Sequence, residues 1–179
     1  MFTKLKAVQQ AIRRVTGQPY TLIGGCVRDS QWGVLPKDYD AAWCIGPDYS
    51  DAEAFAIIET HAMAFRDLGT AVTIYMAYGQ GFNLESGEML QQEVDRFTLA
   101  FYACIKVQMP NREEYDLLIS RMDTVQGLVA THDCNINQVY LNCEGAPSQT
   151  MPDILEFAED IRPERVAYMQ SKFQSHKEA

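Results

Sequence analysis

The chain has 179 residues, enough for one domain with a sizeable core and too few for two comfortable ones. Its composition, 47% hydrophobic and 22% charged, is that of an ordinary globular protein, and no apolar run approaches the length of a membrane span. The net charge of −9, from 15 basic and 24 acidic residues, argues against a broad surface for nucleic acid, which needs Lys and Arg to neutralise phosphates.

The cysteines and the N-terminal segment indicate a compartment. The five cysteines are odd in number and show no Cys-x-x-Cys spacing, which favours reduced thiols without a cysteine zinc site. Residues 1–17 lack the apolar core of a signal peptide. We therefore expect a cytoplasmic protein that does not associate with membranes.

Hydrophobic periodicity and turn residues predict a series of helices and strands. The predicted helices, in chain order, are 3–15, 26–32, 51–63 with Asp51 as its cap, 123–130, and 152–174 with a break at Pro163. The predicted strands are 20–23, 39–45, 71–78, 99–109 and 115–119, followed by a strand-like stretch at 138–143. Residues 79–96 carry no clear pattern. This mixture predicts an α/β or α+β fold with helices on one face of a sheet.

A glycine pair after the first predicted strand is the first feature with chemical meaning. Gly24 and Gly25 let the backbone approach a polyphosphate and leave N–H groups to bind it, and a helix that starts after them adds its positive end. Arg28 offers a forked donor for phosphate oxygens. Alone, a Gly-Gly step is usually a turn and an Arg-Asp pair such as Arg28-Asp29 is usually a surface ion pair, so only the order of the features is informative.

Two aspartates on the next predicted strand, Asp38 and Asp40, complete that order. Residues two apart on a strand point to the same face, roughly 6.6 Å apart along it. They can therefore share bound Mg²⁺ or Mn²⁺, and paired ions can clamp an attacking and a leaving oxygen. A lone Asp-x-Asp is usually a solvated loop. Residues 21–43 contain four features in a fixed order: a strand, Gly-Gly, Arg and Asp-x-Asp. This order favours transfer of a nucleotidyl group from a nucleoside triphosphate.

This order resembles the head-domain signature of class II nucleotidyltransferases, which include CCA-adding enzymes and bacterial poly(A) polymerases. The residues that match the signature are Gly24, Gly25, Val27, Arg28, Asp29, Gly33, Lys37, Asp38 and Asp40. Later segments match in the right order: 65–70 resembles the family's FGT segment, 115–121 the strand with a third acidic residue, and 132–137 a variant of the RRDFTIN motif. The resemblance spans about residues 20–143. It implies the nucleotidyltransferase (polymerase β-like) fold, with a mixed sheet of about five strands and helices packed on it.

The resemblance also implies a set of site residues. Asp38, Asp40 and Asp116 are expected to hold metal and to act in catalysis. Nucleotide binding is expected from Gly24, Gly25, Arg28, Asp29, Lys37, Arg121, His132, Asp133 and Asn137. The residues that follow Asp116, 117–119, are apolar, so its carboxylate needs a partner, which a metal, Arg121 or a hydroxyl would supply. For Lys37 the alternative is a solvated lysine.

The chain departs from the family at its third motif. Thr131 and His132 stand where the family has two arginines, so two fixed charges near the phosphates become one hydroxyl and one titratable ring. Asp133 and Asn137 match positions that contact the incoming nucleotide in the family. Capping and turn chemistry would explain the same two residues without a ligand, and a structural role would explain His132.

The resemblance divides the chain into a head domain, residues 1–150, and a helical extension of the same domain, residues 151–179. Larger members of the family continue into helical domains that hold tRNA, and residues 161–166 resemble the start of that region. A full CCA-adding cycle would need a second copy or a partner to supply the missing surface, so a homodimer is one expectation.

The expected function is metal-dependent transfer of a nucleoside monophosphate from an NTP to an acceptor hydroxyl, with release of pyrophosphate and with an RNA 3′ end such as that of tRNA as acceptor. A small acidic head would suit a phage or mobile element. Two alternatives stay open: a catalytically weak protein that binds nucleotide as a decoy, and a toxin-like or antitoxin-like modifier of tRNA or protein. The acceptor and the preferred NTP do not follow from the sequence.

Overall fold

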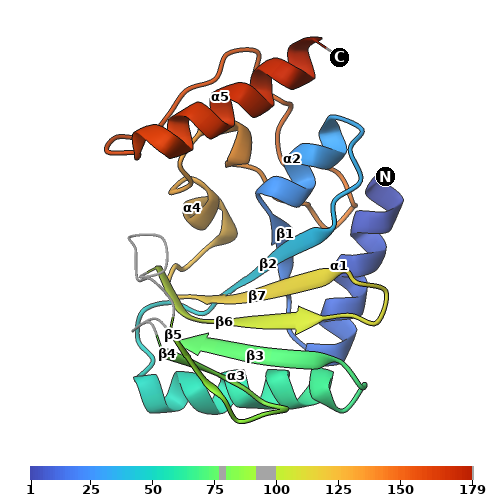
Figure 1. Cartoon of the computed structure of the whole chain (residues 1–179), viewed down its shortest axis with the longest axis vertical. Coiled ribbons are helices and arrows are strands. Elements are labelled where there is room, and N and C mark those ends of the chain that lie inside the picture. Colours follow the sequence, from blue (N-terminus) through green and yellow to red (C-terminus); the bar gives the residue numbers. More distant parts are fainter. Residues whose placement is uncertain (77–79, 92–99, 179) are drawn as a thin grey trace.

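The computed structural model describes residues 1–76, 80–91 and 100–178. Within these ranges the chain forms five α-helices and one mixed sheet of seven strands (Figure 1). The mixed α and β class expected from the sequence is confirmed. Across the same ranges, no helix combines the length and the apolar character needed to cross a membrane.

Helices and strands are interspersed along the sequence, and both the first and the last element are helices. The helices are α1 (Phe2–Thr16), α2 (Gly25–Gln31), α3 (Asp51–Arg66), α4 (Val125–Val129) and α5 (Pro163–Glu178), with a 3₁₀ turn η2 (Asn135–Asn137). The strands are β1 (Thr21–Ile23), β2 (Asp38–Cys44), β3 (Ala71–Met76), β4 (Gln80–Asn83), β5 (Met89–Gln91), β6 (Phe101–Gln108) and β7 (Glu114–Ser120).

The sheet has the strand order β1-β2-β7-β6-β3-β4-β5. Strands β2 and β7 pair in parallel, and every other pair of described strands is antiparallel. All five strands of the expected sheet are present as β1, β2, β3, β6 and β7. Strands β4 and β5 extend the sheet from the segment in which the sequence showed no pattern. Residues 77–78 and 99, the ends of two predicted strands, lie outside the described residues.

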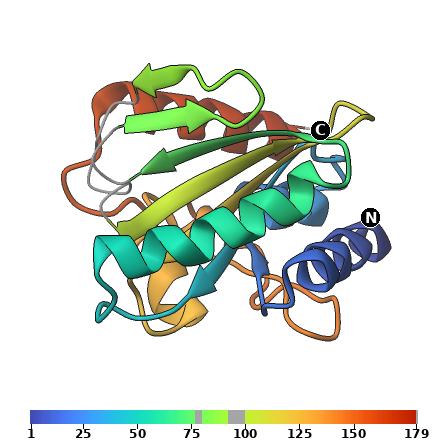
Figure 2. The same ribbon diagram turned by 90° about the horizontal axis from the view of Figure 1, so that it is seen from below.

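Helices cover both faces of the sheet, so the expectation of helices on one face was wrong. Helices α1 and α3 bury the larger core against one face, and Figure 2 shows α3 lying across the strands. On the other face, α4 packs its Leu128 and Val129 against a smaller cluster that includes Ile23, Ala42 and Leu118. Helix α2 lies beside β1 and β2. The second face is therefore only partly covered, and the candidate site lies on it.

The first helix shows how the sequence fixes the core. Leu5, Val8 and Ile12 recur at helical spacing and are fully or almost fully buried in α1. The helix ends at Gly17, whose left-handed backbone (φ 70°) lets its N–H donate to the carbonyl of Arg13 at 2.8 Å. The predicted helix 3–15 is confirmed, with ends that differ by one residue.

The segment before α5 is not helical, so the predicted helix 152–174 was wrong in its first part. Its backbone instead pairs with the segment before η2: the N–H of Asn135 donates to the carbonyl of Glu156 at 3.0 Å, and the N–H of Ala158 to that of Asp133 at 2.9 Å. Pro163, the predicted break, is the first residue of α5, a position where its fixed φ and missing N–H suit a helix.

The cap of α3 also differs from the sequence prediction. Ser50, and not Asp51, is the N-cap: its Oγ accepts from the N–H of Glu53 at 3.1 Å, and the Glu53 carboxylate accepts from the N–H of Ser50 at 3.3 Å. This reciprocal capping box satisfies two N–H groups that the helix cannot satisfy itself.

Replacing Ser50 with Ala should lower the free energy of unfolding by about 1 kcal/mol, because one of these hydrogen bonds is lost. Chemical denaturation with circular dichroism measures the change. Ser175→Ala, an exposed position inside α5, is the matched control and should be neutral or slightly stabilising. Equal effects of the two substitutions would contradict the capping role of Ser50.

Candidate functional site

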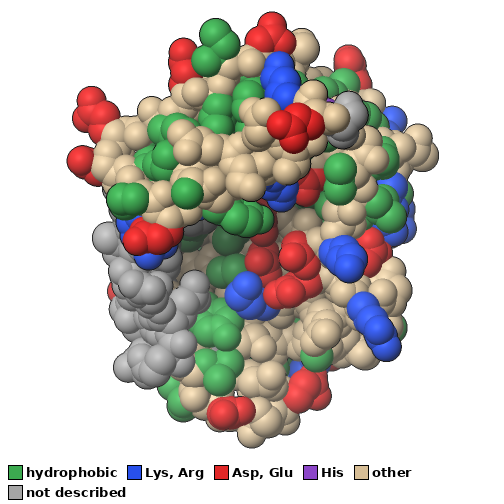
Figure 3. Space-filling view, turned by 45° about the horizontal axis from the view of Figure 1, so that its top comes forward, with side chains coloured by type: hydrophobic (Ala, Val, Ile, Leu, Met, Phe, Trp, Pro, Cys, Tyr) green, Lys and Arg blue, Asp and Glu red, His purple; other side chains and the backbone are tan. Residues whose placement is uncertain are grey.

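Four carboxylates form a block on two neighbouring strands of the partly covered face. The parallel register of β2 and β7 sets Asp38 opposite Glu114 and Asp40 opposite Asp116. Neighbouring strands lie about 4.8 Å apart, and residues two apart on one strand lie roughly 6.6 Å apart on the same face. Figure 3 shows acidic side chains gathered in a hollow near the centre of the molecule, with a basic side chain beside them. The structure thus brings together the three predicted acids and adds Glu114.

Lys106 completes this block, although it lies in none of the sequence motifs. It lies on β6 in register with Asp116. Its Nζ is 3.2 Å from Oδ2 and 3.4 Å from Oδ1 of Asp116, and 3.6 Å from Oε1 of Glu114. The charged partner expected for Asp116 is therefore Lys106 in this structure, and not Arg121. The available signal was that Lys106 is the one charged residue in the otherwise uncharged predicted strand 99–109.

The crowding of the acids changes the protonation of Asp40. Burial raises the pKa of Asp40 most, the facing carboxylate of Asp116 raises it further, and Asp38 adds to this effect. Lys106 works in the opposite direction, but the pKa of Asp40 still rises to about 7. A proton or a bound cation therefore relieves a repulsion that the fold builds in.

The donor set suits a hard divalent cation. Carboxylate oxygens are the ligands that Mg²⁺ and Mn²⁺ prefer, and Asp38, Asp40 and Asp116 present theirs on one face. The side chains do not form a closed cage: among the described residues, no group of three or more His, Cys, Asp or Glu side chains is arranged to enclose a metal ion. Asp116 instead directs both oxygens at Lys106. The residues fit a metal by chemistry, and the three acids would have to converge on it.

The glycine pair lies next to this block. Ile23, the last residue of β1, pairs with Asp40, so the Gly24 turn starts beside the acids. Gly24 has φ 65° and ψ −129°, and its N–H donates to the carbonyl of Val139 at 2.8 Å. One of the expected phosphate donors is therefore used within the protein. A Cβ on Gly24 would lie 3.1 Å from Cε1 of His132.

His132 packs against this turn. Burial lowers the pKa of the imidazole to about 4, and the nearby Arg165 adds to this effect while Asp133 opposes it. The ring is therefore neutral near pH 7. Contact with Gly24 gives His132 a structural role that needs no ligand.

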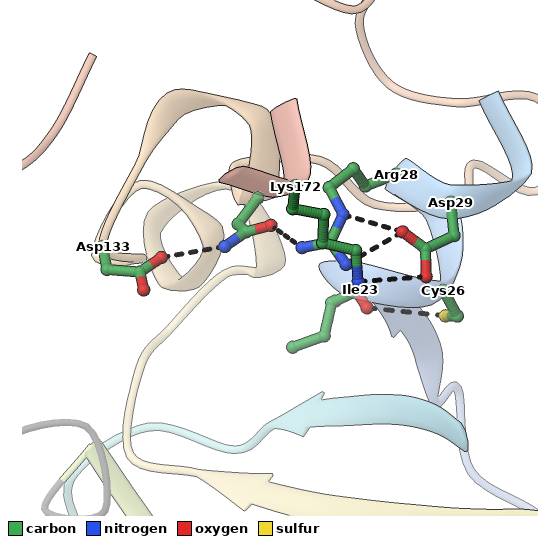
Figure 4. Close-up of polar contacts among 7 residues, drawn as sticks. Ile23, Cys26, Arg28, Asp29, Asp133 and Lys172 are labelled. Carbon is green, nitrogen blue, oxygen red and sulfur yellow. Dashed lines mark hydrogen bonds and ion pairs between the residues drawn. The ribbon is translucent and has the colours of Figure 1, made fainter. Parts of the chain in front are cut away.

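Arg28 and Asp29 belong to an internal chain of polar contacts (Figure 4). The Arg28 guanidinium, with a side chain only 7% exposed, donates to Oδ1 of Asp29 at 2.9 Å and to Oδ1 of Asn137 at 2.5 Å. It also lies over the ring of Trp32, 5.6 Å from the centroid. Lys172 of α5 reaches Oδ2 of Asp29 at 3.7 Å. Arg28 is thus occupied by protein groups and does not face an open phosphate site.

The other half of this chain holds the third motif. The amide of Asn137, which is 3% exposed, donates to Oδ1 of Asp133 at 2.8 Å. The other carboxylate oxygen of Asp133 accepts from Nε of Arg165, on the first turn of α5. Burial works to raise the pKa of Asp133, but hydrogen bonds from Arg165 and Asn137 outweigh it and lower the pKa. The motif residues therefore tie η2 to α2 and α5.

The last two predicted nucleotide-binding residues lie apart from this chain. Arg121 follows β7 and pairs with Asp51 at 3.7 Å, and its guanidinium lies 4.1 Å from the centre of the Tyr102 ring. It stands five residues beyond Asp116, roughly 16 Å along the strand direction, so the structure does not bring it to the acids. Lys37 is exposed and directly precedes Asp38, at the edge of the block.

Neither a scan against protein-family models nor a search of curated proteins returned a match for this chain.

Gly24→Ala should destabilise the protein by about 1–3 kcal/mol, because the backbone conformation of Gly24 is costly for any residue with a Cβ and His132 is in the way. Gly25→Ala is the matched control. Gly25 is helical, and a Cβ there would meet Arg28 Nη2 at an ordinary 3.4 Å, so the change should stay within about 1 kcal/mol. Thermal unfolding of both variants measures the difference, and comparable losses would contradict the assigned turn geometry.

The metal-free protein should lose stability relative to an Asp40→Asn variant as the pH rises from about 4 to about 7. In this window the folded chain keeps a proton on Asp40, whose pKa is raised from 3.8 to about 7, while the unfolded chain has released it. Raising the pH therefore favours unfolding. Urea denaturation of both proteins in a chelating buffer at several pH values measures the difference.

The pH dependence of the wild-type stability alone does not isolate Asp40, because His132 changes the free energy of unfolding with pH in the opposite direction. Its pKa is lowered from 6.5 to about 4, so the unfolded chain takes up a proton that the folded chain does not, and this contribution to stability grows with pH over that range. A difference between wild type and Asp40→Asn that stays constant from pH 4 to pH 7 would show that the Asp40 carboxyl is not perturbed.

Proposed function

We propose that this chain is a metal-dependent nucleotidyltransferase with the polymerase β-like fold. It moves a nucleoside monophosphate from an NTP to an acceptor hydroxyl, for which an RNA 3′ end such as that of tRNA is the leading candidate. One observation carries the proposal. Asp40 pairs in register with Asp116 on one side and with Ile23 on the other, and the glycine turn starts directly after Ile23. The acids that would hold metal therefore lie beside the glycine turn that precedes α2, as the proposed reaction requires.

The reaction needs few protein groups. The acceptor oxygen attacks the α-phosphorus in line, a new P–O bond forms, and the bond from the α-phosphorus to the bridging oxygen breaks with its electron pair leaving on pyrophosphate. A bound Mg²⁺ would neutralise charge on the phosphates. Asp38 and Asp40 would hold this ion, and Asp116 would orient the acceptor hydroxyl and take its proton. Positioning and charge neutralisation would supply most of the acceleration, as in related phosphoryl transfers.

The roles of the basic residues differ from the family expectation. Arg28 holds Asn137 and Asp29 in place, which makes it a positioning residue for α2 and the glycine turn. Lys37, exposed next to Asp38, is the better placed of the predicted basic residues to meet a phosphate. The protein would therefore bind triphosphate with fewer fixed charges than the family signature provides.

The proposal predicts pyrophosphate release when the protein is incubated with Mg²⁺, the four NTPs and total RNA. Asp38→Ala and Asp40→Ala should each lower the rate by about 100-fold or more, because groups that stabilise transition-state charge contribute effects of this order. Asp153→Ala, an exposed acid outside the block, is the control and should leave the rate unchanged. Labelled NTPs would show which molecule carries the added nucleotide.

Nucleotide binding without turnover is the second candidate, and the internal engagement of Arg28 and Arg121 favours it. Calorimetry with Mg²⁺ and non-hydrolysable NTP analogues separates the two functions. Binding without pyrophosphate release would support the decoy, and release that is equal in Asp40→Ala and wild type would contradict the proposed acid cluster.

A further inference from the structure

We infer that the Lys106 ammonium takes the place of one of the two cations that a carboxylate cluster of this kind can hold. The site then binds one divalent cation together with its nucleotide. The inference rests on the proposed function, since it concerns the metal that the same acids would bind.

Lys106 contacts both oxygens of Asp116. Its register with Asp116 places the ammonium against both oxygens of that carboxylate, at 3.2 and 3.4 Å. It also reaches Glu114, two residues earlier on β7, at 3.6 Å. The two acids of β7 therefore share one positive charge that is covalently part of the chain.

The two acids of β2 have no such partner. Within residues 1–76, 80–91 and 100–178, neither Asp38 nor Asp40 forms an ion pair with a basic side chain. The charge of the block is therefore distributed unevenly: the two acids of β7 form direct ion pairs with Lys106, whereas Lys106 acts on Asp40 only from a longer distance. A divalent cation is attracted to the β2 side, where Asp38 and Asp40 lie two residues apart on the same face of the sheet.

A second divalent cation would compete directly with Lys106. Paired ions in two-metal sites lie about 3.5–4 Å apart and share a bridging carboxylate. Asp116, the acid opposite Asp40, already has both oxygens on the ammonium. A second ion bound to Asp116 would therefore have to displace Lys106 or lie next to a like charge. Lys106 is thus a positioning residue, which holds the Asp116 carboxylate in one orientation.

The test counts bound Mn²⁺ by electron paramagnetic resonance, with protein saturated by a mixture of non-hydrolysable analogues of the four NTPs. Wild type should bind one Mn²⁺ per chain beyond the background measured with Asp40→Asn. Lys106→Met, which keeps the length of the side chain and removes its charge, should bind two. Lys106→Arg should stay at one. Lys177→Met, an exposed lysine near the C-terminal end of α5, makes the same change in net charge and should also stay at one.

The outcomes separate this inference from the proposed function. Two bound ions in wild type, or one in a folded Lys106→Met variant, would overturn the role of Lys106 and leave the nucleotidyltransferase proposal standing. No bound Mn²⁺ in wild type with any analogue would overturn both. If Lys106→Met does not fold by circular dichroism, Lys106→Arg decides: a second ion bound there would show that a positive charge at this position does not exclude it.

Discussion

The opposition of Asp40 and Asp116 on adjacent parallel strands is the constraint on which the site depends. Like charges at this spacing repel, and burial raises the cost because water cannot screen them fully. The sheet nevertheless fixes both backbones, since β2 and β7 are interior strands with Tyr39, Ala41 and Leu117 buried on the other face. A proton, the Lys106 ammonium or a bound cation can each relieve the repulsion, so the protonation state and the cation content of the site are linked.

A second set of polar contacts, between α2, the η2 segment and α5, lies next to the acid block and holds the glycine turn. Helix α5 touches α2 through Lys172 and Asp29, and touches the segment before η2 through Arg165 and Asp133. Arg28 and Asn137 close the gap between these contacts. Partly exposed ion pairs such as these contribute little net stability. Arg28 is buried, so removing Asn137 or Asp29 would leave its charge without one of its partners. These contacts hold α2, and with it the glycine turn, in one position above the acids.

Much of the fold could be predicted from local patterns, because strands with alternating or continuous apolar residues and helices with apolar stripes are recognisable within a short window. That Asp38 and Asp40 lie on the same face of one strand also follows from local strand geometry. Strands β4 and β5 could not be predicted, since Gly81 and the polar residues around it have low strand propensity and pair only because β3 offers an edge. The helix predicted across 152–162 was wrong because the backbone of this segment forms hydrogen bonds with Asn135 and Asp133, which no local pattern encodes.

The candidate site shows the same division. Its acids were recognisable from their spacing, but the internal role of Arg28 and the contact of Lys106 with Asp116 depend on which strands and helices become neighbours.

The parallel pairing of β2 and β7 has a consequence for the order of folding events. Strands β6 and β7 are joined by a short turn and can form a local hairpin. Strand β2 is far from β7 in the sequence, so their pairing closes a long loop. Pairing between distant segments carries a large loop-closure entropy and is slow. The carboxylates of β2 and β7 would therefore come face to face late in folding, when Lys106 is already beside Asp116, so the repulsion arises after most of the stabilising contacts exist.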